Sequence, residues 1–351
     1  MNGQQEPLVS VVTPVYNGGK YLRECIESII AQSYTNWRYT IVNNRSTDDS
    51  LEIALHYASL DPRVCVHDNA EFLPIIDNHN RGFSLIDRDS IYCKPLMADD
   101  WLYPECLEVM VSCALTQPSI GLVCTLASTG DNQILFDQLR PADFPLGSPT
   151  TVLAGSIACR IPLLEDRHFF GSPTTELIRA DLIRKRRPFY DPVNLHADAE
   201  SCYDILQESD FAFIHQALAF IRKHEQSQTS LMLGLESMRS GRFYTLTKYG
   251  RVYLNDDEFR RCYRQRLTQY YAMLAVAAVE LRGRAFWEFH RRMLIHSGAP
   301  LNRMRLAYAM ASHVVHRLAS PRSFVRAVAG GIKAAAMRKL GKSSDSSVRH
   351  H

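Results

Sequence analysis

The sequence predicts an α/β fold in which helices flank a mostly parallel sheet. Through residue 126, apolar runs of strand length alternate with segments that repeat apolar residues at helical spacing. The first run, LVSVVTPVY (residues 8–16), is apolar almost throughout, as in a strand covered on both faces. Polar clusters follow several runs, and ligands of parallel sheets bind beyond the carboxyl ends of the strands. These clusters therefore indicate one shared site.

The elements of this first part follow in strand and helix order. The run 8–16 is broken by Asn17-Gly18-Gly19, and KYLRECIESIIAQ (20–32) then repeats apolar residues on one helical face. We expect further strands at 38–44, 64–67, 91–97 and 121–126, and helices at 48–60, around 83–86 and from residue 104 onward. Such alternation requires crossover connections, which favours a parallel sheet.

The later part of the chain changes from alternation to helices. Residues 128–150 carry few periodic signals and are expected to form a long loop. We then expect a strand and a helix at 174–185, a helix at 196–206, two paired strands at 210–215 and 217–224, and long helices near 256–281, 284–296 and 301–318. The predicted organisation is an α/β domain over 1–233, a helical C-terminal extension over 234–342 and a disordered tail over 343–351.

Composition is that of an ordinary globular chain. Of 351 residues, 46% are hydrophobic and 22% are charged. The nine cysteines form no C-x-x-C pair, so we expect reduced thiols. Neither a signal peptide nor an uninterrupted apolar run of transmembrane length is visible. The expected location is therefore cytoplasmic.

The C-terminal region is strongly basic. Residues 289–344 contain eleven Arg or Lys and no Asp or Glu, and SPRSFVRAVAGGIKAAAMRKLGK (320–342) is loosely amphipathic. This pattern favours an anionic membrane surface as a partner, which would place the chain at the inner face of the plasma membrane. A solvated helix packed on the α/β domain is the alternative. No recognition motif supports nucleic-acid binding.

Two adjacent aspartates, Asp99 and Asp100, follow the strand predicted at 91–97. Like charges at the end of a buried strand repel each other and are costly to desolvate. Three interpretations are open from the residues alone. The pair caps the helix that begins near Pro104, lies in a solvated turn, or holds a cation.

Three stretches in order, VSVVTPVYNGGKYLRECIESIIAQSYTNW, YTIVNNRSTDDSLEIA and MADDW, resemble the family 2 glycosyltransferases of the GT-A fold. The resemblance is close through Asp100 and continues more thinly to about Thr229. The segments GSPTTELIRADLIR, HADAESCYDIL and IRKHEQSQT resemble those of a bacterial subgroup that acts on cell-surface polysaccharides.

This resemblance implies an inverting glycosyltransferase. Its donor would be a nucleotide diphosphate sugar, with a UDP-sugar favoured, and its acceptor a saccharide or a lipid-linked saccharide. Mn²⁺ or Mg²⁺ would bridge the donor diphosphate. Two alternatives remain: an inactive relic that binds carbohydrate or a partner, and a sugar nucleotidyltransferase. The latter usually carries a glycine-rich phosphate loop that PVYNGGK matches only weakly.

The resemblance also assigns roles at the strand ends. Asp100 would bind the metal, and Asp99 the ribose or a metal-bound water. Pro14, Tyr16 and Asn17 match the first donor-binding strand end, although Asn17 could instead cap the following helix.

Two further asparagines match donor-binding positions of the family. Asn43 stands where the family usually has an aspartate that accepts the N3–H of uracil. An amide oxygen can still accept that hydrogen bond, without charge. Asn80 matches an asparagine used near the donor. The stretch Ser46-Thr47-Asp48 beside Asn43 is expected to serve at least as an N-cap for the next helix.

The remaining candidates lie later in the chain. The family reads Glu-Asp at the start of a helix facing the donor, and here Ala197-Asp198 matches it, so Asp198 is the predicted catalytic base. Glu200 is the alternative base, and Asp198 could be only a first-turn acid favoured by the helix dipole. In RKHEQSQT, Arg222 would contact phosphate and His224 would be a second metal ligand.

Overall fold

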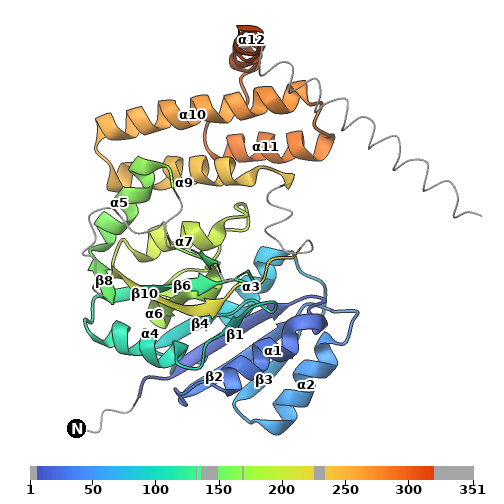
Figure 1. Cartoon of the computed structure of the whole chain (residues 1–351), viewed down its shortest axis with the longest axis vertical. Coiled ribbons are helices and arrows are strands. Elements are labelled where there is room, and N and C mark those ends of the chain that lie inside the picture. Colours follow the sequence, from blue (N-terminus) through green and yellow to red (C-terminus); the bar gives the residue numbers. More distant parts are fainter. Residues whose placement is uncertain (1–5, 132, 136–148, 168–169, 225–233, 320–351) are drawn as a thin grey trace, which may run out of the picture. The chain divides into compact units, whose positions relative to one another are not determined.

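A computed structural model describes residues 6–131, 133–135, 149–167, 170–224 and 234–319. It confirms the α/β fold with a mostly parallel sheet (Figure 1). The strands are β1 (Val9–Val15), β2 (Trp37–Asn43), β3 (Val64–Asp68), β4 (Tyr92–Pro95), β5 (Trp101–Leu102), β6 (Ile120–Ser128), β7 (Ile134–Leu135), β8 (Thr150–Leu153), β9 (Glu176–Arg179) and β10 (Asp210–Phe220). Their order in the sheet is β3-β2-β1-β4-β9-β6-β10-β5, with β7 beside β6 and β8 beside β10.

The parallel pairs bring the predicted polar clusters to one edge of the sheet. β1 runs parallel to β2 and β4, β2 to β3, and β6 to β10, while β5, β7, β8 and β9 are antiparallel to their neighbours. Val15, Asn43 and Asp68 are register partners at the ends of β1, β2 and β3. Asp99 and Asp100 lie between β4 and β5. The carboxyl ends of these strands therefore place the polar residues along one side of the sheet, called here its carboxyl edge, as the alternation predicted.

Helices cover both faces of the sheet. In chain order, the helices of the described residues are α1 (Gly19–Ile30), α2 (Ser50–Leu60), α3 (Ile75–Ser84), α4 (Cys106–Leu115), α5 (Gly155–Glu165), α6 (Ala180–Lys185), α7 (Ala197–Ile205), α9 (Ser237–Tyr253), α10 (Asp256–Val279), α11 (Arg284–His296) and α12 (Arg303–Ala319). One hydrophobic cluster joins the sheet to α1, α2 and α4, and a second joins it to α3, α5, α6, α7 and α9. Val11 belongs to the first cluster and Val12 to the second, because successive strand residues point to opposite faces.

Three local predictions differ from the structure. Residues 210–220 form one strand, not two, because register shifts between Ile214 and Ala217 bend β10 without ending it. The helix expected around 83–86 is α3, which begins earlier, at Ile75, and ends at Ser84. Helix α5 was not predicted, because it starts directly after the loop expected over 128–150 and contains Pro162.

The chain divides into two compact units, residues 1–263 and 264–351. The predicted domain boundary lay at 233/234. The structure places α9 in the first unit, because Leu246, Tyr249 and Tyr253 belong to the hydrophobic cluster on that sheet. The basic segment 320–342 and the tail 343–351 lie outside the described residues. Among the described helices, none combines the length and apolarity needed to span a bilayer.

Candidate active site

Asp100 is buried at the carboxyl edge of the sheet, with both oxygens held. It is 5% exposed. Its Oδ2 accepts a hydrogen bond from Thr174 Oγ1 at 2.6 Å, and its Oδ1 accepts one from the backbone N–H of Arg222 at 3.0 Å. Burial, and next the charge of Asp99, raises the pKa of Asp100, and the two hydrogen bonds oppose that shift. A solvated turn is therefore excluded for Asp100.

Asp99, next to Asp100, contacts two residues that follow the end of β10. Its Oδ2 lies 2.9 Å from His224 Nε2, and its carbonyl oxygen accepts a hydrogen bond from Arg222 Nε at 3.1 Å. The Arg222 guanidinium also donates to Glu24 Oε2 at 2.6 Å and lies over the Tyr21 ring. The structure therefore brings Arg222 and His224 to the aspartate pair, with Arg222 engaged by a carboxylate.

The capping interpretation of the aspartate pair is wrong. Helix α4 begins at Cys106 with Glu105 as its N-cap residue, and no side chain caps it. Phe220 pairs with Trp101 in the antiparallel β5–β10 ladder, and the two rings stack at a centroid distance of 4.9 Å. This pairing is what carries the segment after β10 to the aspartates.

The side chains of Asp99, Asp100 and His224 suit a divalent cation whose remaining ligands are phosphate oxygens and water. Mg²⁺ and Mn²⁺ take one or two carboxylates from a protein and fill the remaining positions with phosphate oxygens and water. Asp99 and Asp100 supply such a pair, and His224 adds an imidazole. Within the described ranges, no group of three or more His, Cys, Asp or Glu is arranged to hold a metal. The protein thus offers part of a coordination shell.

Two residues beneath the aspartates escaped the sequence analysis. Thr174 lies in the 3₁₀ turn η2 (Pro173–Thr175), just before β9. Lys94 is fully buried, and its ammonium donates to the carbonyl oxygens of Thr174 and Pro95. Burial lowers the pKa of Lys94. The signal for Lys94 was a lysine inside the apolar run IYCKPLM, whereas no sequence spacing tied Thr174 to Asp100.

A second cluster lies at the ends of β1, β2 and β3. Asn43 Nδ2 donates to Asp68 Oδ1 at 2.7 Å. The other end of the amide, Oδ1, is buried and has no hydrogen-bond partner among the described residues. Tyr16 is 51% exposed and Phe72 is 57% exposed, and their rings meet edge to face at 5.0 Å. This edge therefore presents an aromatic surface and an unused acceptor.

Asn17 links two loops and does not cap a helix. It has a left-handed φ of 51°, and its Oδ1 accepts the backbone N–H of Thr47 at 2.8 Å. The first amides of α1 are capped across the loops, by Ser50 Oγ on Gly18 and by Asp48 Oδ2 on Gly19. The alternative interpretation of Asn17 as a helix cap is thus wrong.

Pro14 and Asp48 complete this edge. Pro14 lies within β1, opposite Val42. Asp48 Oδ1 accepts the backbone N–H of Ser50 at 3.1 Å, so Asp48 serves the first turns of α1 and α2 together. The N-cap residue of α2 is Asp49, so the cap predicted within Ser46-Thr47-Asp48 lies one residue too early.

Asn80 holds a backbone segment in place. Its Nδ2 donates to the carbonyl oxygen of Tyr190 at 2.8 Å, and its Oδ1 accepts the N–H of Tyr190 at 2.7 Å. Tyr190 packs edge to face on Phe83 of α3. Both ends of the Asn80 amide are therefore used within the protein.

Asp198 lies in the first turn of α7, as predicted, and is partly exposed. Burial lowers the pKa of His79, and the Asp198 carboxylate opposes that shift. His79 Nε2 in turn lies 3.5 Å from Met97 Sδ, just before the aspartate pair. The Asp198 side chain at the start of α7 is partly open to solvent.

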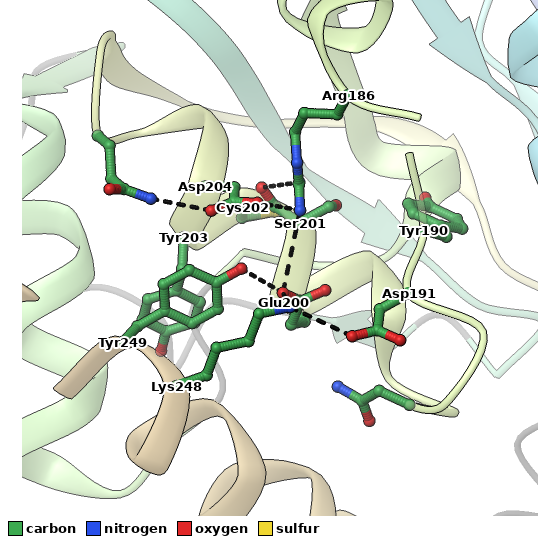
Figure 2. A network of polar contacts seen from close by, with 12 residues as sticks. Arg186, Tyr190, Asp191, Glu200, Ser201, Cys202, Tyr203, Asp204, Lys248 and Tyr249 are labelled. Carbon is green, nitrogen blue, oxygen red and sulfur yellow. Dashed lines mark hydrogen bonds and ion pairs between the residues drawn. The ribbon is translucent and has the colours of Figure 1, made fainter. Parts of the chain in front are cut away.

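Glu200 lies in a buried network of polar contacts (Figure 2). Its side chain is fully buried, accepts a hydrogen bond from the Tyr249 hydroxyl and lies 2.8 Å from Lys248 Nζ. Lys248 also contacts Asp191 at 3.2 Å. Glu200 thus ties α7 to α9, and of the two predicted base candidates only Asp198 has solvent access.

The sequence is similar to those of known glycosyltransferases. The family model "Glycosyl transferase family 2" matches residues 10–180. The glycosyltransferase RT0329 of Rickettsia typhi is 26% identical over 69% of this chain and 73% of its own length. YibD of Escherichia coli is 36% identical over 30% of each chain, and the teichuronic acid glycosyltransferase TuaG of Bacillus subtilis is 39% identical over 17% of this chain and 24% of its own. The chain thus spans less than a third of YibD.

Solved structures share the fold at low identity. Staphylococcus aureus TarS 1–349 in complex with UDP-GlcNAc has a TM-score of 0.58 at 14% identity, covering 86% of this chain and 87% of that one. The mannosyltransferase PcManGT of Pyrobaculum calidifontis, in complex with GDP-Man and Mn²⁺, has a TM-score of 0.53 at 15% identity, covering 96% and 88%. These likenesses confirm the predicted GT-A fold.

Proposed function

We propose that the chain, whose residues 10–180 match the model of glycosyl transferase family 2, transfers a sugar from a nucleotide diphosphate donor, a UDP-sugar, to a saccharide or lipid-linked saccharide. The observation that carries the proposal is the buried Asp100, held by Thr174 and by the backbone of Arg222 beside the Asp99–His224 contact. TuaG, a relative named for teichuronic acid biosynthesis, supports an acceptor in surface polysaccharide synthesis.

The aspartate pair is proposed to bind the diphosphate end of the donor. Asp100 and His224 would hold Mn²⁺ or Mg²⁺, and Asp99 would contact the ribose or a metal-bound water. When bound, the cation would neutralise the charge that develops on the leaving diphosphate. PcManGT, which shares the fold, is described with Mn²⁺. Arg222 would reach phosphate by releasing Glu24, which it contacts from the surface.

Asp198 is proposed to take the proton from the acceptor hydroxyl. Its place in the first turn of α7 and its partial exposure, which leaves room for an acceptor, support this role. The deprotonated oxygen would then form its bond to the anomeric carbon as the bond to the diphosphate breaks. A single displacement of this kind inverts the anomeric centre.

Titration calorimetry of the purified chain tests the proposal. UDP, dTDP and GDP are titrated with and without Mn²⁺ into the wild type, Asp100→Ala and the control Asp89→Ala, whose carboxylate is mostly exposed. We expect metal-dependent binding of UDP that is lost in Asp100→Ala and kept in the control. Binding of no nucleotide by the folded wild type would overturn the proposal.

A further inference from the structure

The Asn43 amide is held in one orientation by Asp68. Only 2.7 Å separates Asn43 Nδ2 from Asp68 Oδ1, and the second carboxylate oxygen, Oδ2, lies 3.6 Å from Arg45 Nη1. An aspartate at neutral pH accepts hydrogen bonds and cannot donate them. The NH₂ end of the amide must therefore face Asp68, and Oδ1 must face the opposite way.

The oxygen of the Asn43 amide, Oδ1, is an acceptor that receives no hydrogen bond from the described residues. Asn43 is 1% exposed, and its Oδ1 has no hydrogen-bond partner in the part of the chain that the structure describes. A buried polar atom left unpaired costs stability, so such an atom at a strand end points to a ligand that supplies the missing donor.

The surroundings of Asn43 suit a flat ring. Tyr16 directly follows Val15, the register partner of Asn43, and its exposed ring meets that of Phe72. The next residue, Asn44, holds the loop that carries Phe72: its Oδ1 accepts the N–H of Leu73 at 2.9 Å and its Nδ2 donates to the Leu73 carbonyl at 2.8 Å. Aromatic faces stack on nucleobases irrespective of base identity, so the hydrogen bond must supply the selection.

We propose that Asp68 is a positioning residue that fixes Asn43 Oδ1 as an acceptor and so selects a donor base with a ring N–H, uracil, against cytosine. This inference rests on the proposed function, because it assumes a nucleotide at this edge. Uracil offers N3–H to Oδ1. Cytosine presents a lone pair at N3, and two acceptors would then face each other in a buried site.

Replacing the carboxylate by an amide removes the constraint. In Asp68→Asn either end of the new side chain can meet Asn43, so the Asn43 amide can turn and present its NH₂ to the base. We expect the wild type to bind UDP about 10- to 100-fold more tightly than CDP, as for one unmatched polar contact. Asp68→Asn should reduce this ratio several-fold, whereas Asp68→Glu, which still only accepts, should keep it.

A swap of the two side chains provides the matched control. Asn43→Asp places two carboxylates in contact, and we expect UDP binding to weaken about tenfold or more. In Asn43→Asp/Asp68→Asn the amide of residue 68 donates to the new carboxylate, whose second oxygen is again an acceptor for N3–H. The double variant should therefore recover UDP binding and the preference over CDP.

The measurement is calorimetric titration of UDP and CDP with Mn²⁺ into the wild type and these variants, with the melting temperature of each as the check on folding. A UDP-binding wild type whose UDP-to-CDP ratio survives in Asp68→Asn would overturn the inference and leave the proposed function standing. A double variant no better than Asn43→Asp would also overturn it. A wild type that binds neither nucleotide would overturn both.

Discussion

His224 and Asp99 are 125 positions apart in sequence, yet His224 Nε2 lies 2.9 Å from Asp99 Oδ2. The antiparallel pairing of β5 with β10 creates this contact, because it places the segment after Phe220 beside the turn after β4. An imidazole against a carboxylate fixes both side chains in a site where a cation and a diphosphate are proposed to bind.

His224→Ala should weaken metal-dependent UDP binding about 10- to 100-fold, as the loss of a ligand or of its orienting partner does in metal sites. The physical reason is that Asp99 loses the group that orients it. His215→Ala is the matched control, since His215 lies on β10, the strand that precedes His224, and bonds Thr151 instead. Calorimetry with Mn²⁺ and UDP measures the effect. Equal losses in the two variants would contradict a specific role for His224.

Asp198→Asn and Glu200→Gln should separate catalysis from stability. Removing the proposed base should lower the turnover number about 10²- to 10⁴-fold and leave UDP binding unchanged. Glu200→Gln should instead lower the free energy of unfolding by roughly 1–3 kcal/mol, because it disrupts the buried contacts to Lys248 and Tyr249. Turnover per folded molecule should survive. Release of UDP from UDP-sugars and urea unfolding measure the two quantities; the reverse pattern would make Glu200 the base.

Glu176 should make the protein less stable as the pH rises. Glu176 is 1% exposed and its Oε2 has no partner among the described residues. Burial, and next the charge of Asp198, raises its pKa from 4.5 to about 8. Between these values the unfolded chain releases a proton that the folded chain keeps, so folding loses free energy as the pH increases.

Glu176→Gln should therefore be more stable than the wild type near neutrality. The gain should be absent below pH 4.5 and reach at most about 3 kcal/mol at pH 7. Urea unfolding across this range measures it. Glu200→Gln should instead lower the free energy of unfolding, because the Glu200 carboxylate contacts Lys248 and Tyr249. A gain for Glu176→Gln that does not depend on pH would show that the buried carboxyl is not the cause.

Periodicity predicted most of the fold, because the strands near the amino terminus are apolar runs separated by clear helical faces. It also placed Asn43 and the aspartate pair at one edge, since parallel strands share their carboxyl ends. The division of β10 was predicted wrongly, because a bulge looks like a strand end in sequence.

The hydrogen-bond and ion-pair partners of the site side chains could not be predicted from the sequence. Neither the role of Thr174 under Asp100 nor the burial of Glu200 follows from local spacing, because each depends on segments brought together only by the tertiary fold. The same holds for Asn80, whose match to a donor-binding position gave no sign of its bonds to Tyr190.

Asn80→Ala should reduce stability more than donor binding. The variant loses two hydrogen bonds to the Tyr190 backbone, which leaves a partly buried N–H and C=O unpaired, and the free energy of unfolding should fall by roughly 1–3 kcal/mol. Asn80→Asp keeps the acceptor for the Tyr190 N–H and loses the donor, so its cost should differ from that of alanine. Urea unfolding and calorimetry with UDP are the paired measurements. We expect UDP affinity to stay within about threefold, because both ends of the amide bond the Tyr190 backbone rather than the ligand. A large loss of UDP affinity at unchanged stability would instead restore Asn80 to the direct donor contact that the family resemblance implies.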